Sequence, residues 1–185
     1  QFLKTDASGN LGWTTPLTQT VGTWTPADGS GAGLTFSSAV GHYVLMGKLI
    51  AFDMDTSETL VNHILTQWDQ GNSVLPLDQR LPQLKKRDLV QRLGVAEVIT
   101  DTETLKFSAP SMEPDDALVI ATSGTTGNPK GVVLSHAAIK ASSQMTSSIL
   151  NVEKSSDEWL CCLPVSHIGG FSVITRALQN GVSLK

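Results

Sequence analysis

The chain has 185 residues, of which 40% are hydrophobic and 16% are charged, and its formal net charge is −4. This composition is typical of globular proteins and differs from that of disordered chains. The negative charge argues against a nucleic-acid-binding protein, because clustered Lys and Arg side chains bind phosphate backbones. No apolar run approaches the roughly 20 residues that cross a bilayer. We therefore expect neither a nucleic acid nor a membrane among the partners.

The first 55 residues are rich in Gly, Thr, Ser and Trp and contain few signals that begin or end a helix. Residues 26–29 have the residue types of a tight turn. The stretch "HYVLMGKLIAFDM" (42–54) predicts two short strands joined at Gly47 and Lys48. These patterns predict a small β-rich segment over residues 1–55.

The pattern changes after residue 55, where apolar residues recur with the spacing of one helix face. These residues are Leu60, Val61, Ile64, Leu65 and Trp68. Asp55 is the expected N-cap of this helix, with Glu58 three residues later as in a capping box. A short buried strand is then predicted by "NSVLPL" (72–77).

A second helix is predicted over residues 81–94, with Gly94 just past its end, where glycine is favoured. Its residues facing the core are expected to be Leu84, Leu89 and Leu93. Ser135 is the expected N-cap of a later helix and places His136 in its first turn. Further strands are expected at 96–100, 117–122, 132–134 and 158–163, and further helices at 135–150 and 169–181.

Strands that alternate with helices are typical of a parallel sheet covered by helices. The sequence therefore predicts an α/β fold for residues 56–185, a partial, mostly parallel sheet with packed helices, preceded by the small β-rich segment. The chain begins with Gln1 rather than Met and ends just after an expected helix. We expect it to be a fragment of a longer reading frame.

The two cysteines, Cys161 and Cys162, are neighbours in the chain. Neighbouring residues on a strand point to opposite faces, which makes a bond between them awkward. We expect two buried thiols on the strand at 158–163, in a reducing compartment. The spacing typical of zinc ligands is absent, so no metal site is expected.

The stretch "ATSGTTGNPKG" (121–131) lies between two apolar strands. Glycines let backbone N–H groups approach an anion closely, hydroxyl groups donate hydrogen bonds to phosphate oxygens, and a lysine adds positive charge. The loop is not a Walker A motif, because Pro129 precedes Lys130 and Gly131 follows it. The loop also lacks the G-x-G-x-x-G pattern of dinucleotide-binding folds, so it does not indicate a dinucleotide site. A polyphosphate cradle is the functional interpretation, and a flexible surface linker is the alternative.

Three stretches together resemble the adenylate-forming (AMP-binding) superfamily, which includes acyl-CoA synthetases, peptide-synthetase adenylation domains and luciferases. They are "TSGTTGNPKGV" (122–132) with the Ser-His pair that follows, "PLDQRLP" (76–82) and "LPVSHIGG" (163–170). The resemblance covers residues 56–185. Within the superfamily the spacing is most similar to the o-succinylbenzoate–CoA ligases of menaquinone synthesis.

The resemblance implies a two-step reaction. A carboxylate attacks the α-phosphate of ATP, which carries Mg²⁺, and gives an acyl-adenylate and pyrophosphate. A thiol, usually that of CoA, then displaces AMP. The resemblance implies that a set of loop residues binds the β- and γ-phosphates: Thr122, Ser123, Gly124, Thr125, Thr126, Gly127 and Lys130. It also implies that His167 lines the acyl pocket. Lys130 and His167 are therefore the candidate catalytic residues.

Each residue implied to line the acyl pocket also has a purely structural interpretation. His167 is alternatively a histidine of a solvent-exposed loop. Gly169 and Gly170 either let the backbone approach the substrate or ease the entry into the helix at 169–181. The acyl substrate and the thiol acceptor are not specified by the sequence.

Several family segments have no counterpart in the chain. They include the Tyr-Gly-x-Thr-Glu segment, the ribose-binding aspartate and the small C-terminal domain with its lysine. We therefore expect weak or no ligase activity from these residues alone. A non-catalytic nucleotide-binding module is an alternative function.

The N-terminal stretch "QFLKTDASGNLGWTTP" (1–16) resembles linkers of phage tail-fibre and other virion structural proteins, and the stretch at 22–52 resembles the β-rich repeats that follow such linkers. Residues 1–55 therefore resemble a virion structural segment. The alternative function is accordingly a virion structural protein, with oligomers formed through this β-rich segment. The expected location is the cytoplasm for the ligase and the virion for the alternative. A fused or misjoined reading frame, an assembly artefact or a deliberate chimaera would each explain the combination.

Overall fold

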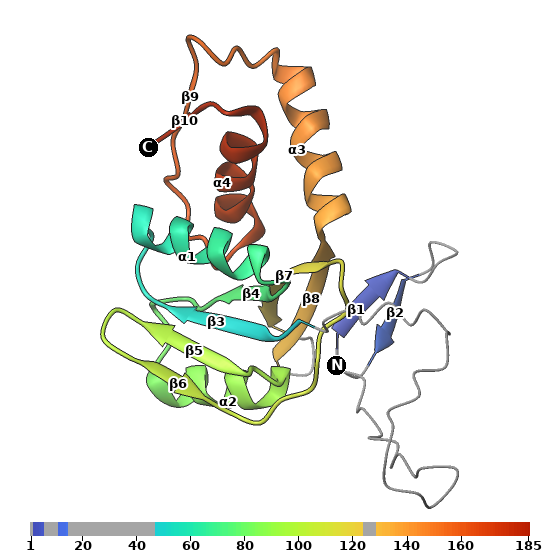
Figure 1. Cartoon of the computed structure of the whole chain (residues 1–185), viewed down its shortest axis with the longest axis vertical. Coiled ribbons are helices and arrows are strands. Elements are labelled where there is room, and N and C mark those ends of the chain that lie inside the picture. The colour runs from blue at the N-terminus through green and yellow to red at the C-terminus, as the bar shows by residue number, and fades with distance from the viewer. Residues whose placement is uncertain (1, 6–10, 15–46, 124–128) are drawn as a thin grey trace, which may run out of the picture.

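The computed structural model describes residues 2–5, 11–14, 47–123 and 129–185 (Figure 1). Its helices are α1 (Glu58–Asp69), α2 (Gln83–Leu93), α3 (His136–Leu150) and α4 (Ile168–Asn180). The strands of its larger sheet are β1 (Phe2–Thr5), β2 (Leu11–Thr14), β3 (Leu49–Asp53), β4 (Ser73–Pro76), β5 (Glu97–Thr100), β6 (Thr104–Lys106), β7 (Asp116–Ser123) and β8 (Pro129–Ser135). Two short strands, β9 (Glu158–Trp159) and β10 (Ser183–Leu184), form a separate small sheet.

The larger sheet has the strand order β2-β1-β8-β7-β4-β3-β5-β6. The strands β7, β4, β3 and β5 are mutually parallel and form its centre. β8 and β6 are antiparallel to their neighbours β7 and β5. This arrangement confirms the α/β class and the partial, mostly parallel sheet with packed helices.

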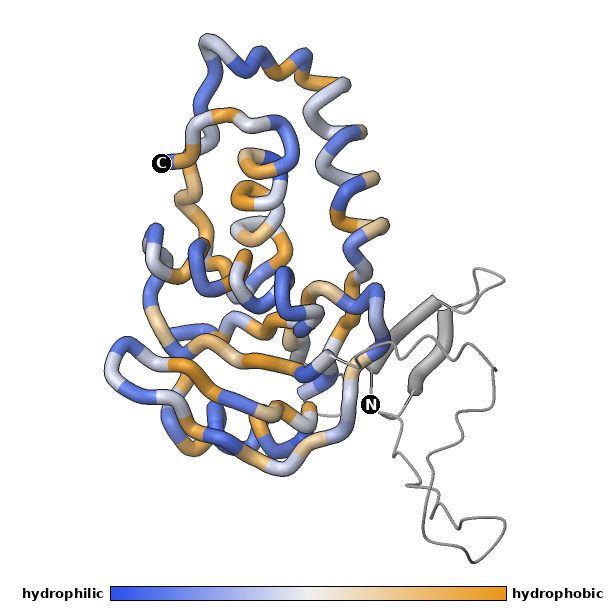
Figure 2. Tube along the Cα trace, in the orientation of Figure 1, coloured by the Kyte–Doolittle hydropathy of each residue, from blue (hydrophilic) through white to orange (hydrophobic). Residues whose placement is uncertain are grey.

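The sheet lies between two helical layers (Figure 1). Alternate residues of β3 face opposite layers, as the two-residue period of a strand requires. Ile50 and Phe52 join the core beneath α1, α3 and α4, whereas Leu49 and Ala51 join the core beneath α2. Figure 2 shows apolar colour along these central strands and on α4. Both faces of the central strands are therefore buried.

β3 belongs to this central sheet, although the sequence groups its residues with the N-terminal β-rich segment. It pairs in parallel with β4 and β5, which follow it in the chain. The predicted strand before Gly47 and the predicted turn at 26–29 lie outside the described residues. β1 and β2 pair with each other, and β1 also pairs with β8 at the edge of the sheet.

The N-cap of α1 is Ser57, so the prediction of Asp55 was wrong. The Ser57 hydroxyl accepts a hydrogen bond from the Leu60 backbone N–H at 3.2 Å. Helix α1 begins at Glu58, so Glu58 lies one residue after the cap rather than three. A capping box centred on Asp55 is excluded by this spacing.

We expect Ser57→Ala to lower the free energy of unfolding by about 1 kcal/mol, because the Leu60 N–H loses its partner. Urea denaturation measures this change. Asp55→Ala is the matched control, and its effect should stay within about 0.5 kcal/mol, as at ordinary surface positions. A larger effect of Asp55→Ala would show that Asp55 contributes to the cap.

Helix α2 ends at Gly94 as predicted, with Gly94 in the left-handed region at φ 65°. Leu89 and Leu93 are buried, which confirms two of the three predicted core positions. Leu84 was wrongly predicted, because it is 79% exposed. Lys86 occupies the buried face instead and is 5% exposed.

The later helices agree with the sequence. Ser135 caps α3 and its hydroxyl accepts a hydrogen bond from the Ala138 N–H at 3.1 Å. His136 is the first residue of α3. Helix α4 ends at Asn180 with Gly181 in the left-handed region at φ 61°.

The cysteines do not lie on a core strand, so this prediction was wrong. β9 ends at Trp159, although the Cys161 N–H still donates to the Lys185 carbonyl at 2.7 Å. Cys161 is half-buried and Cys162 is exposed. Burial raises the pKa of the Cys161 thiol, and the neighbouring Cys162 adds to the increase.

Candidate functional site

The carboxyl ends of β3, β4 and β7 lie at one edge of the sheet, because these strands are parallel. The chain leaves β3 for α1 on one face and leaves β4 for α2 on the other face. Neighbouring strands whose connections go to opposite faces leave a crevice between them, and open α/β sheets bind ligands there. The edge outside β3 and β4 is therefore a candidate binding site.

A pocket of about 220 Å³ lies at this edge. Three segments line it: residues 54–56 after β3, residues 77–80 after β4, and residues 164–166 before α4. Ser166 is 7% exposed, and its hydroxyl has no hydrogen-bond partner among the described residues. A buried hydroxyl without a partner costs free energy, and a ligand in this pocket could supply one.

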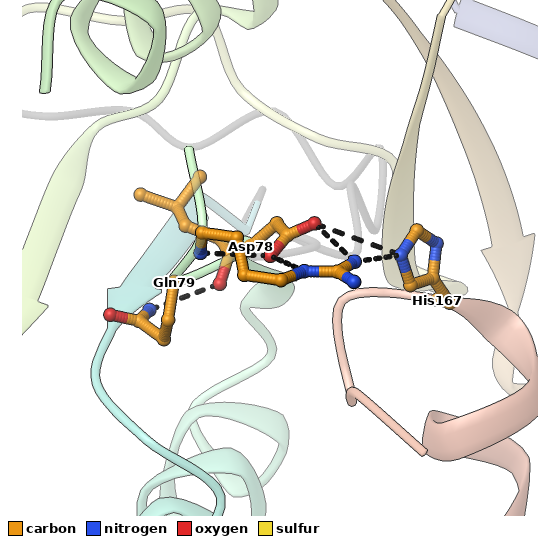
Figure 3. A network of polar contacts seen from close by, with 5 residues as sticks. Asp78, Gln79 and His167 are labelled. Carbon is orange, nitrogen blue, oxygen red and sulfur yellow. Dashed lines mark hydrogen bonds and ion pairs between the residues drawn. The ribbon is translucent and has the colours of Figure 1, made fainter. Parts of the chain in front are cut away.

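Asp78, Arg80 and His167 form a polar network beside the pocket (Figure 3). Arg80 donates to both carboxylate oxygens of Asp78, from Nε to Oδ1 at 3.0 Å and from Nη2 to Oδ2 at 2.8 Å. The Nη2 atom also lies 3.1 Å from Nε2 of His167. The network thus joins the segment after β4 to the start of α4, across 87 residues of sequence.

The charges of this network reinforce each other. The hydrogen bond from Arg80 is the largest cause that lowers the pKa of Asp78, from 3.8 to about 2, although burial opposes it. The same hydrogen bond raises the pKa of Arg80 above its ordinary value. Both groups therefore stay ionised at neutral pH, and the pair is fixed as carboxylate and guanidinium.

The contribution of Asp78 to stability should depend on pH. Because its folded pKa is depressed, the unfolded chain binds more protons than the folded chain between pH 3.8 and about 2. The stabilisation is present above this window and is lost as the pH falls through it. We expect the difference in unfolding free energy between the wild type and Asp78→Asn to shrink in acid. A difference that is constant with pH would contradict the ion pair.

β7 ends at Ser123, at the same edge of the sheet, and the Gly/Thr-rich stretch follows it in the sequence. β7 and β8 are antiparallel, with Thr122 opposite Lys130 and Ser123 opposite Pro129. Residues directly opposite in such a pair have their side chains on the same face. The Thr122 hydroxyl donates to the Lys130 carbonyl at 3.3 Å. The hairpin thus brings Thr122 and Lys130 together at the base of the loop.

The other loop residues of the predicted phosphate site lie outside the described residues. They are Gly124, Thr125, Thr126 and Gly127.

His167 is the N-cap residue of α4, and 55% of its side chain is exposed. A Cβ on Gly170 would lie 2.4 Å from the carbonyl oxygen of Pro164 and 2.5 Å from that of Leu163. Gly170 therefore lets α4 pack closely on the turn before it. At Gly169 the nearest atom, Cδ1 of Leu163, would lie 3.3 Å away, a milder contact. This close packing fixes the start of α4, from which His167 extends.

Sequence reasoning missed Asp78, Arg80 and Ser166 as members of the site. A signal for the first two was present, because they are an oppositely charged pair directly after a buried strand. The carboxyl ends of parallel strands are where α/β folds place ligands. The burial of the Ser166 hydroxyl is visible only in the folded structure.

Within the described part of the chain, no group of three or more His, Cys, Asp or Glu side chains could hold a metal ion. In that same part, no helix combines the length and apolar character needed to cross a bilayer.

The chain matches the family model for AMP-binding enzymes over residues 47–184. A 2-succinylbenzoate–CoA ligase of Enterococcus faecalis is 29% identical over 162 residues, covering 75% of this chain and 33% of the relative. The corresponding ligase of Bacillus mycoides is 34% identical over 90 residues, covering 48% of this chain and 18% of the relative. The chain thus spans a third or less of the length of these curated relatives.

Solved structures share the fold. The o-succinylbenzoate CoA synthetase of Bacillus subtilis, in complex with ATP and magnesium ion, has a TM-score of 0.64 and 20% identity and covers 75% of this chain and 44% of that one. The N-terminal subdomain of Klebsiella oxytoca NpsA, with a TM-score of 0.63 and 22% identity, covers 75% of this chain and 40% of that one. Since the family model matches well over half of the residues, this chain belongs to the AMP-binding enzyme family.

Proposed function

We propose that this chain provides the phosphate-binding loop and part of the acyl pocket of an ATP-dependent ligase. The ligase joins a carboxylate to the α-phosphate of MgATP, releases pyrophosphate, and then transfers the acyl group from AMP to a thiol. The hairpin of β7 and β8 carries this proposal, because it holds Lys130 opposite Thr122 at the base of the Gly/Thr-rich loop.

The proposed contacts to the β- and γ-phosphates are charge-assisted hydrogen bonds, which are stronger than neutral ones. Lys130 supplies the charge, and the loop supplies hydroxyl and backbone donors. The residues assigned to this role are Thr122, Ser123, Gly124, Thr125, Thr126, Gly127 and Lys130. Positioning and charge stabilisation of this kind suffice for catalysis of phosphate chemistry.

The proposed carboxylate is 2-succinylbenzoate and the proposed acceptor is CoA. Both follow from the names of the relatives in Enterococcus faecalis and Bacillus mycoides. His167 is proposed to line the acyl pocket from the start of α4, next to the pocket that residues 54–56 and 77–80 line. The proposed location of such a ligase is the cytoplasm.

The αβ unit is proposed to begin near Gly47 rather than at residue 56. The family match starts at residue 47, and β3 is a central strand of the sheet. Residues 1–46 then precede this unit in the sequence, and their strands β1 and β2 lie at the edge of its sheet. The resemblance of the N-terminal stretch to virion proteins stays a prediction.

Lys130→Ala should weaken the binding of MgATP at least tenfold, or by about 1.4 kcal/mol. The reason is the loss of the one cation that the loop motif contributes. Calorimetric titration of the chain with MgATP measures the effect.

Lys140→Ala is the matched control, because Lys140 is an exposed residue of α3 and its removal changes the net charge equally. Its affinity for MgATP should match that of the unsubstituted chain. An equal loss in both variants, or no MgATP binding by the unsubstituted chain, would contradict the proposed function.

A further inference from the structure

We propose that Asp78 and Arg80 are positioning residues for His167, which fix its imidazole ring with the proton on Nδ1 and with Nε2 turned toward Arg80. This inference rests on the proposed function for the role of His167 in the acyl pocket. The arrangement itself follows from three features of the structure.

The first feature is the chemistry of the contact between Arg80 and His167. A guanidinium group has five N–H donors and no acceptor. Nη2 of Arg80 lies 3.1 Å from Nε2 of His167, and Oδ2 of Asp78 lies 3.7 Å from the same nitrogen. The contact with Arg80 is the shorter one, and it is a hydrogen bond only if Nε2 accepts with its lone pair. A neutral imidazole that accepts at Nε2 carries its proton on Nδ1. The contact thus selects one of the two tautomers.

The second feature is the way in which Arg80 is held. Its side chain binds both carboxylate oxygens of Asp78, and its backbone N–H donates to Oδ1 of Asp78 at 3.0 Å. Such fork-to-fork pairs add geometric specificity as well as energy. The guanidinium group is therefore oriented before it meets His167. A lysine would supply charge at this position without the planar fork.

The third feature is the direction of the ring. His167 lies at the N-terminus of α4, which the close packing at Gly170 fixes against the preceding turn. Figure 3 shows one ring nitrogen of His167 facing Arg80 and Asp78, and the other facing away from them. The Nδ1–H group is thus directed away from the pair, on a side chain that is 55% exposed. Under the proposed function, this N–H group donates a hydrogen bond to an oxygen of the acyl substrate.

The tautomer can be read directly from the ¹⁵N chemical shifts of the imidazole ring in the full, ligand-free chain. Comparison with His167→Gln assigns the signals among the four histidines of the chain. We expect Nε2 of His167 to give the shift of an unprotonated nitrogen and Nδ1 that of a protonated one. In Arg80→Ala the population of the Nδ1–H form should fall below half, toward the Nε2–H form that free histidine favours in water.

Arg92→Ala is the matched control. Arg92 forms a similar pair with Asp88 on the surface of α2, with Nε and Oδ1 2.7 Å apart. Its removal should leave the His167 signals unchanged. Asp78→Asn removes the anchor of Arg80 with little change of shape, and it should shift the tautomers in the same direction if Arg80→Ala fails to fold. In Arg80→Lys the population of the Nδ1–H tautomer should lie between those of the wild type and Arg80→Ala.

An Nε2–H tautomer in the wild type would overturn the inference, as would identical His167 signals in the wild type and both site variants. The measurement needs no ligand. It therefore fails or succeeds separately from the MgATP titration that tests the proposed function.

Discussion

Phe171→Ala is expected to lower the free energy of unfolding by about 3–5 kcal/mol, the range for truncating a large buried aromatic residue. Phe171 is fully buried in the core between the sheet and the layer of α1, α3 and α4. Its ring meets that of Trp68 edge to face, with centroids 6.0 Å apart. Truncation removes this contact and leaves a cavity between α1, α4 and the sheet.

Urea denaturation of the wild type and the variant measures the loss. Phe107→Ala is the matched control, because it removes the same atoms from a side chain that is 49% exposed. Its effect should be within about 0.5 kcal/mol. Equal effects of the two substitutions would contradict the assignment of the core to this helical layer.

Lys86→Ala is expected to cost a similar amount, about 3–5 kcal/mol, because it leaves a partner charge buried without compensation. The ammonium group of Lys86 pairs with Oδ1 of Asp53 at 2.5 Å and also donates to Oε1 of Gln79 at 3.3 Å. The side chains of the ion pair are only 7% and 14% exposed. The pair ties α2 to the carboxyl end of β3.

Lys85→Ala is the control for this prediction, since Lys85 is the exposed neighbour on the same helix. Its effect should be within about 0.5 kcal/mol. The double variant Asp53→Leu with Lys86→Met should recover most of the loss, because apolar replacement of a whole buried pair is often neutral. A single variant as stable as the wild type would contradict the buried ion pair.

The order and type of most elements could be predicted from the sequence because their apolar periods are clear, whereas the short strands β6 and β10 were not predicted. The helix ends at Gly94 and Gly181 were also predictable, since both glycines take the left-handed conformation that ends a helix. These features depend on a few neighbouring residues. Local reasoning was sufficient for them.

The buried face of α2 could not be predicted as well. Leu84 lies nine residues before Leu93, and nine residues at 3.6 per turn place the two on opposite sides of a helix. Lys86, Leu89 and Leu93 share the buried face instead. A lysine is an unexpected core residue on sequence grounds, and its partner Asp53 is 33 residues away on β3.

The sequence predicted only those residues of the candidate site that lie within a contiguous motif. The loop motif identified Thr122 and Lys130, and its hairpin places them opposite each other. The network of Asp78, Arg80 and His167 depends on the order of the strands and on the packing of α4. Neither can be derived from a local pattern, because the partners lie 87 residues apart in the sequence.

Competition between pyrophosphate and AMP for the MgATP site tests the central claim most directly, because the loop is assigned to the β- and γ-phosphates. Pyrophosphate is predicted to displace a fluorescent ATP analogue from the chain at concentrations at which AMP does not. Lys130→Ala should abolish this preference. Displacement by AMP as effective as displacement by pyrophosphate would contradict the account.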